Sequence, residues 1–260
     1  MKKRATSNPT IIFCFLLLMA ATLPAAEAGD RRLWPTKGQW RAAFSGAIRD
    51  PHTWAPAAGA AAIGLAGADE RIARWAVRET PIFGSPESAR RWSDGFARAT
   101  EIGLYATAFG SSMRERTWNI GLTNIGAVYL GQSSTGHVTS LLKSVTSRER
   151  PDGRDFRSFP SGHTSGAFAN AAVASRSLRS MNLPRPAERG LWITFMTLAA
   201  GTAWARVEGG RHYPSDVLAG AALGNFLGRF VSEAFLPAGG PTLNVHLVPD
   251  EPRVMVGWQF

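Results

Sequence analysis

The sequence predicts an all-α protein: a helical bundle of about six helices with a short C-terminal β-hairpin. Apolar residues recur at helical spacing through most of the chain, and prolines and glycines separate these periodic stretches. In the last twenty residues the apolar pattern changes to strict alternation, which is typical of strands. The chain has 260 residues, which is enough for one domain with a sizeable core.

The first 28 residues have the features of a secretory signal peptide. Met1–Arg4 is basic, Ile11–Ala21 is apolar but short for a membrane span, and Ala26-Glu27-Ala28 has the form of a cleavage site. An uncleaved N-terminal anchor is the alternative interpretation. The only cysteine, Cys14, lies in this segment, so the mature chain needs no disulfide in an oxidising compartment.

Apolar spacing and helix-breaking residues divide the remaining chain into elements. We expect an irregular lead-in over residues 29–50 and a loop over residues 80–92, where Pro81, Gly84 and Pro86 gather. Helices are expected over residues 53–68, 96–113, 116–146, 162–179, 189–206 and 214–236.

The tail over residues 238–260 has a different character. Residues 243–247 and 254–260 alternate apolar and polar or small positions, and Pro249 and Pro252 lie between them. This pattern predicts a β-hairpin, to which the sequence assigns no function.

The charge of the chain is strongly basic. The formal charge is +10, and it falls to +8 when the signal segment, with three cations and one anion, is removed. Of the cationic residues 25 are arginines and four are lysines, so Lys143 is unusual in its surroundings. A basic surface attracts phosphorylated substrates, anionic lipids or nucleic acids, although an arginine-rich composition is the simpler explanation for most of these residues.

Hydropathy argues against a membrane-spanning body for the mature chain. The charge-free stretches at residues 190–205 and 217–228 are 16 and 12 residues long, and the mean hydropathy is −0.09. The stretch at residues 117–142 is longer, but it carries asparagine, glutamine, serine, threonine and histidine. A bilayer span needs about 20 predominantly apolar residues. We therefore expect a soluble or peripherally attached periplasmic protein.

Charged residues and histidines recur at fixed spacings over 74 residues of the second half. The pattern reads K-x6-R-P, then P-S-G-H, then R-x5-H-x3-D. The predicted helices over 162–179 and 189–206 are each about 27 Å long and are joined by a short turn, so they run antiparallel. The end of the second helix therefore returns to the level of the start of the first, and the motifs meet at one end of the bundle.

The residues of these motifs suit the binding of a phosphate-like anion. Lys143, Arg150 and Arg206 supply charge-assisted hydrogen bonds to nonbridging oxygens. Ser161 and Gly162 begin a helix, whose free N–H groups and dipole attract anions. Three further arginines in the same stretch either support the site from behind or steer the substrate, or they are plain surface charges: Arg148, Arg154 and Arg157.

His212 and Asp216 are four residues apart, which places them on one helix face. The carboxylate can accept a hydrogen bond from one ring nitrogen, which leaves the other nitrogen free to attack phosphorus. Without the other motifs, a pair that only caps the helix would be the better interpretation.

In their order and spacing these motifs resemble those of the type 2 phosphatidic acid phosphatase (PAP2) superfamily. That superfamily includes lipid phosphatases, bacterial class A acid phosphatases and vanadium haloperoxidases. The resemblance covers about residues 50–237 and implies one PAP2/haloperoxidase-like domain over residues 29–237. It also implies that His163 is the general acid for the leaving oxygen and later the base for water. Ala205 stands where the family usually has serine, and we expect this to tune the site.

The sequence and the resemblance together predict a phosphatase that hydrolyses phosphate monoesters, either small esters or lipid phosphates and pyrophosphates, through a phosphohistidine. No cofactor is expected, since metal-binding motifs are missing from the sequence and three cations replace a metal ion. A vanadium-dependent haloperoxidase and a non-catalytic anion-binding protein are the alternatives. The expected partner is a phosphorylated small molecule or lipid, with peripheral membrane contact; no nucleic-acid module is recognised, and the oligomeric state stays open.

Overall fold

The computed structural model describes residues 35–114, 118–235, 242–247 and 254–259. The described residues form eight α-helices, which confirms the predicted all-α class. The predicted signal peptide over residues 1–28 lies outside them. The helices are α2 (Lys37–Arg49), α3 (Pro51–Leu65), α4 (Asp69–Glu79), α5 (Pro86–Arg114), α6 (Trp118–Thr146), α7 (Gly162–Ser180), α8 (Arg185–Glu208) and α9 (Pro214–Phe235).

Two strands follow the last helix. β1 (Thr242–Leu247) pairs antiparallel with β2 (Val254–Gln259), with Val245 opposite Val256. Among the described helices, none combines the length and the hydropathy that a bilayer crossing requires.

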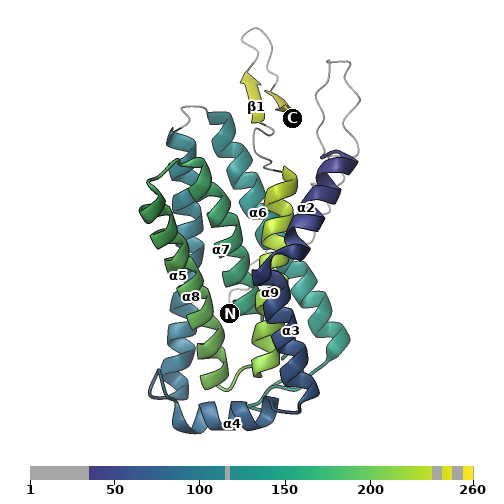
Figure 1. Ribbon diagram of the computed structural model, residues 1–260, viewed down its shortest axis with the longest axis vertical. Helices are drawn as coiled ribbons and strands as arrows, with labels where there is room; N and C mark the ends of the chain where they lie inside the picture. The colour runs from purple at the N-terminus through teal and green to yellow at the C-terminus, as the bar shows by residue number, and fades with distance from the viewer. Residues whose placement is uncertain (1–34, 115–117, 236–241, 248–253, 260) are drawn as a thin grey trace, which may run out of the picture. The chain divides into compact units, whose positions relative to one another are not determined.

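Helix α7 is the central element of the packing. It contacts α5, α6, α8 and α9, and Figure 1 shows these long helices running side by side. The largest group of buried apolar side chains joins α5, α6, α7 and α8 and includes Leu104, Val128, Val173, Leu178 and Phe195. Because α7 begins at the P-S-G-H motif, this core fixes the position of the predicted anion site.

Glycines allow α9 to approach α7 closely. Gly220, Gly224 and Gly228 recur every four residues, so they lie on one face of α9. A Cβ on Gly220 would lie 2.7 Å from the carbonyl oxygen of Ser161, and one on Gly224 would collide with the carbonyl of Ser165. The backbones of the two helices therefore touch where both carry motif residues.

The N-terminal part is more helical than the sequence analysis predicts. The lead-in over residues 29–50 is predicted to be irregular, but it contains α2, which begins with a capping box. Thr36 Oγ1 accepts from the Gln39 N–H at 3.2 Å, and Gln39 Oε1 accepts from the Thr36 N–H at 2.7 Å. The irregular prediction for this segment is therefore wrong.

An additional helix and one helix boundary also differ from the prediction. α4 is an additional helix with alternating charges, in which Ala73 and Ala76 are buried. The loop predicted over residues 80–92 ends early, because α5 begins at Pro86. Proline is well suited to the first turn of a helix, where its missing N–H leaves no hydrogen bond unmade.

Candidate active site

A cleft of about 990 Å³ opens along α5, α6 and α7. Residues from all three sequence motifs meet in it, as the antiparallel arrangement of α7 and α8 predicts. Five of the predicted site residues line the cleft: Lys143, Arg150, Gly162, His163 and Arg206. The other three are buried and do not line it: Ser161, His212 and Asp216.

Two of the cations in the cleft are largely removed from water. Lys143 is 9% exposed, and its Nζ donates to the backbone carbonyl of Arg157 at 2.6 Å. Burial, together with the charge of Arg150, lowers the pKa of Lys143 to about 8. Arg206 is 7% exposed, and burial lowers its pKa to about 10 despite the nearby Asp94. An anion placed here would meet positive charges that water screens only weakly.

Arg206 also has a donor that the described residues leave unpaired. Its Nε is buried and has no hydrogen-bond partner among them. A buried N–H without a partner is costly, and a bound anion would satisfy it.

The ring of His212 is held in one tautomer. Its Nδ1 lies 2.7 Å from the backbone carbonyl of Ser158, which can only accept, so Nδ1 carries the proton. Asp216 Oδ2 is 3.8 Å from Nδ1, an ion-pair distance and not the direct hydrogen bond that the spacing suggested. Nε2 is therefore the unprotonated nitrogen, and Arg150 Nη1 lies 3.4 Å from it.

The surroundings of His212 keep the ring neutral. Burial lowers its pKa to about 4, assisted by the charges of Arg206 and Lys143, although Asp216 opposes the shift. A neutral imidazole with a fixed tautomer is the form that acts as a nucleophile.

Asp216 is fully buried and satisfied by several donors. Oδ1 accepts from Arg148 Nη1 at 2.7 Å, and Oδ2 accepts from Ser158 Oγ at 2.5 Å and from the Tyr213 N–H at 2.8 Å. Burial alone would raise the pKa of Asp216, but the interactions with His212, Ser158 and Arg148 hold it below its ordinary value. The carboxylate is thus ionised and fixed beside His212.

Arg148 belongs to this buried network. Its Nη2 donates to Asp69 Oδ2 at 2.9 Å, and its guanidinium lies 4.2 Å from the centre of the Tyr213 ring. Asp69 in turn accepts from the Ser215 N–H at 2.9 Å. The sequence leaves open whether Arg148 supports the site or is a surface charge. Support of the site fits Arg148, because Nη1 and Nη2 of its guanidinium each donate to a carboxylate.

His163 lies in the wall of the cleft. Its Nε2 is 3.1 Å from Asp94 Oδ1, and Arg206 Nη1 is 3.7 Å from the same oxygen. Burial and the charge of Arg206 lower the pKa of His163, while Asp94 opposes them.

The start of α7 is only partly available to a ligand. The Ser161 N–H donates to the backbone carbonyl of Asp216 at 3.0 Å, and its Oγ accepts from Thr164 Oγ1 at 3.0 Å. Gly162, by contrast, lines the cleft. Ala205, which stands in the place of the family's serine, is fully buried and does not line it.

Sequence reasoning missed three residues of this region: Asp69, Asp94 and Ser158. Asp69 and Asp94 lie on α4 and α5, far along the chain from the motifs, and only the packing of those helices brings them near. Ser158 lies two residues before the P-S-G-H motif, and its position next to that motif was the one available signal.

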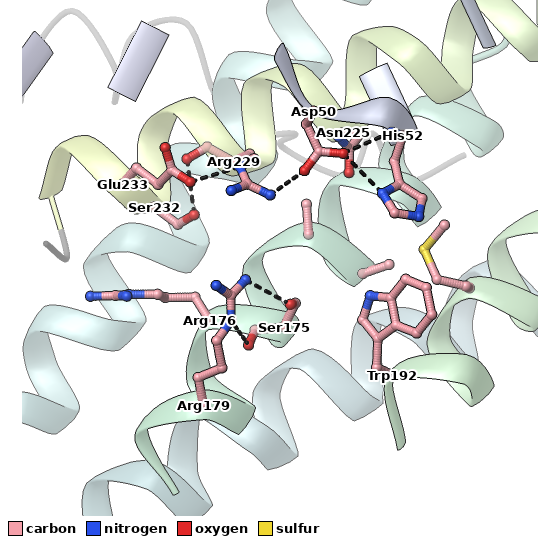
Figure 2. A pocket seen from close by; sticks show the side chains of 13 residues that line it. Asp50, His52, Ser175, Arg176, Arg179, Trp192, Asn225, Arg229, Ser232 and Glu233 are labelled. Atoms are coloured by element: carbon pink, nitrogen blue, oxygen red, sulfur yellow. Dashed lines mark hydrogen bonds and ion pairs between the residues drawn. The ribbon is translucent and has the colours of Figure 1, made fainter. Parts of the chain in front are cut away.

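A second pocket, of about 240 Å³, lies among the start of α3, α7, α8 and α9 (Figure 2). In it Arg229 lies between Asp50 and Glu233, with its Nε 2.7 Å from Glu233 Oε1. His52 Nδ1 lies 2.9 Å from Asp50 Oδ1. Because these charged groups pair with one another, we interpret the pocket as a structural junction that ties α9 to the start of α3.

Part of this chain is similar to known proteins. Residues 117–238 match the PAP2 superfamily. A lipid A 1-phosphatase of Porphyromonas gingivalis is 34% identical over 127 residues, which cover 48% of this chain and 26% of that protein. A lipid A 1-phosphatase of Rhizobium johnstonii is 35% identical over 133 residues, which cover 45% of this chain and 48% of that protein. The chain thus spans about half or less of the length of these relatives.

A solved structure shares the fold. The transmembrane PAP2 type phosphatidylglycerolphosphate phosphatase from Bacillus subtilis has a TM-score of 0.54 and 24% sequence identity, and the match covers 75% of this chain and 94% of that one. At this identity the likeness concerns the fold alone. The match over residues 117–238 and the motif residues that meet in one cleft are the features that this chain shares with the PAP2 superfamily.

Proposed function

We propose that this chain is a phosphatase that removes the phosphate from lipid phosphates through a phosphohistidine on His212. The observation that carries the proposal is the fixed tautomer of His212, whose unprotonated Nε2 is 3.4 Å from a guanidinium of the cationic cleft. A nucleophile beside an anion site is the arrangement that phosphoryl transfer requires. The relatives named lipid A 1-phosphatase favour a lipid phosphate over a small soluble ester.

In the first step the phosphate is held by Lys143, Arg150 and Arg206, with the N–H groups at Gly162 as further donors. His212 Nε2 attacks phosphorus, so a nitrogen–phosphorus bond forms while the bond to the leaving oxygen breaks. His163 gives its proton to that oxygen, and the alcohol leaves. The cations stabilise the charge that spreads over the equatorial oxygens.

In the second step water attacks the phosphohistidine. His163, now neutral, takes a proton from the water, the nitrogen–phosphorus bond breaks, and orthophosphate leaves. His212 returns to its neutral form, with Nδ1 still bonded to Ser158.

The position of Arg150 adds one requirement to this scheme. Its Nη1 lies near His212 Nε2 and also donates to the Arg211 carbonyl at 3.1 Å. The guanidinium must therefore turn from the ring toward the phosphate when substrate binds. Its ion pair with Asp155, 2.7 Å away, gives it a pivot.

The test uses purified protein with phosphatidate, a long-chain alkyl phosphate and p-nitrophenyl phosphate in detergent micelles, each with and without EDTA. We expect hydrolysis that persists in EDTA and is faster for the lipid substrates. His212→Ala should abolish turnover, and acid quenching of the wild type with ³²P-labelled substrate should trap an acid-labile phosphoprotein. Unimpaired hydrolysis by His212→Ala would contradict the proposal.

We further propose that the site works in the periplasm at a membrane surface. The secretory features of residues 1–28 favour export. The exposed apolar side chains of α3, Trp54 and Leu65, favour contact with lipid. Fractionation of cells that express the full chain tests both parts.

A further inference from the structure

Asp94 places a carboxylate in a cleft that otherwise gathers cations. It lies on α5, before the stretch that matches the family. Its Oδ1 is 3.1 Å from His163 Nε2 and 3.7 Å from Arg206 Nη1. This single oxygen is therefore close to both His163 and Arg206. In the proposed function these two residues interact with oxygens of the substrate.

We propose that Asp94 is a positioning residue, which holds the protonated ring of His163 toward the cleft and gives way to the oxygens of the arriving phosphate ester. The inference rests on the proposed function, in which His163 is the general acid. Because a carboxylate only accepts, its partner Nε2 must carry a proton. The proton for the leaving oxygen is thereby kept on the nitrogen that faces Asp94.

Most of the charged side chains that line the cleft with His163 are cations, so the negative charge of Asp94 is needed to keep the ring protonated. Cations line the cleft from α6, from the loop after α6, from α8 and from the loop after α8, while the acids that line it both come from α5. The lining cations are Lys143, Arg150, Arg157, Arg206 and Arg211, with Arg98 also on α5, and the lining acids are Asp94 and Glu101.

Loss of the carboxylate has a defined effect on the ring. Burial and Arg206 lower the pKa of His163, and Asp94 opposes them by its charge and its hydrogen bond. In Asp94→Asn the opposing charge is gone, so His163 loses its proton at a lower pH than in the wild type. Since the first step needs protonated His163, the alkaline limb of the activity profile moves to lower pH.

The negative charge of Asp94 also repels a phosphate that binds in the cleft. Its side chain is 62% exposed and competes with the substrate for Arg206. An asparagine would leave Arg206 to the anion and remove the repulsion. We expect orthophosphate to bind Asp94→Asn about fivefold more tightly, the size of a partly exposed charge interaction.

The experiment compares the wild type with Asp94→Asn, Asp94→Glu and Glu101→Gln. NMR titration of the His163 ring signals, assigned with His163→Gln, gives the midpoint of protonation, and calorimetry gives orthophosphate affinity. We expect a lower midpoint and tighter binding in Asp94→Asn, and recovery of the midpoint in Asp94→Glu. Glu101→Gln is the matched control, because it removes the same charge two turns along α5 and should leave the His163 midpoint unchanged.

Two results would overturn the inference: an unchanged His163 midpoint in Asp94→Asn, or weaker orthophosphate binding by it. General damage to the cleft predicts the second result, so tighter binding separates positioning from mere structural support. If the wild type hydrolyses no phosphate ester, the proposed function fails. The ring titration still decides whether Asp94 holds the proton of His163.

Discussion

At the scale of single residues, the buried network around Asp216 shows why the motifs alone under-describe the site. The spacing of His212 and Asp216 predicted a direct bond, yet the ring donates to the carbonyl of Ser158 and the carboxylate stands 3.8 Å away. Asp216 is instead bound by Arg148, which also holds Asp69. A sequence motif names the chemically active groups but not the neighbours that orient them.

The network makes Arg148 a sensitive position. In Arg148→Met two nearly buried carboxylates lose their shared partner, and we expect the free energy of unfolding to fall by about 2 kcal/mol. Turnover should fall as well, because Asp216 is no longer held beside His212. Urea denaturation and steady-state kinetics measure the two effects.

Arg154→Met is the matched control for this change. The Arg154 side chain is 63% exposed and meets Asp152 only at 3.6 Å. Its removal should change stability by less than about 0.5 kcal/mol. An equal loss of unfolding free energy in both variants would show that the contacts of Arg148 with Asp69 and Asp216 add no stability of their own.

The buried ring of His212 predicts a dependence of stability on pH. Its pKa falls from the ordinary value of 6.5 to about 4 in the folded chain, so between these values the unfolded chain binds a proton that the native chain does not. The free energy of unfolding therefore rises with pH across this window, by about 3 kcal/mol from this group.

Urea denaturation of the wild type and of His212→Gln, between pH 4 and 8, isolates the contribution of this ring. The difference between the two should grow in favour of the wild type up to about pH 6.5 and then level off. Parallel curves through pH 4–6.5 would show that the native ring titrates like an exposed histidine.

At the scale of elements, the sequence predicted α3 and α6 to α9 well, placed the start of α5 ten residues too late, and missed α2 and α4. α5 to α9 each have apolar residues at helical spacing or clear proline boundaries. α2 and α4 bury mainly alanines, such as Ala43 and Ala73, which give a weak hydrophobic signal. The capping pair of Thr36 and Gln39 was present in the sequence and would have identified α2.

The site divides in a similar way. His163 and Arg206 could be placed together because the predicted helices over residues 162–179 and 189–206 are antiparallel and of equal length, which brings their ends level. Asp94 could not, since its position depends on how α5 packs against α7 and α8, and local sequence does not encode that packing.

The contact of α7 with α9 depends on glycine. In Gly224→Ala the new methyl group would collide with the carbonyl of Ser165, and backbone atoms cannot yield without moving a helix. We expect a loss of about 3 kcal/mol in the free energy of unfolding and reduced turnover, since α7 carries His163. Thermal and urea denaturation measure the loss.

Gly190→Ala on α8 is the control, because a Cβ there meets nothing within 4 Å. Alanine is the better helix former, so this variant should gain about 0.5–1 kcal/mol. A similar loss in both glycine variants would show that close packing of α7 and α9 is not the cause.

At the scale of the whole molecule, the chain combines a basic charge with exposed apolar helices. The formal charge is +10, and α3 carries no aspartate, glutamate, lysine or arginine. On α3 Trp54 is 55% exposed and Leu65 is 90% exposed. Basic charge and exposed apolar side chains together favour a surface of anionic lipid.

This combination predicts binding to vesicles that contain phosphatidylglycerol. Each exposed apolar side chain that enters the bilayer adds about 1.5–3 kcal/mol. The double change Trp54→Ser and Leu65→Ser should therefore weaken binding at least about tenfold in sedimentation assays.

Leu191→Ser with Ile193→Ser on α8 is the matched control, since those side chains are also exposed but lie on a different helix. Equal weakening by both pairs would mean that no particular helix contacts the lipid, and unchanged binding by the α3 pair would mean that its apolar side chains serve another partner.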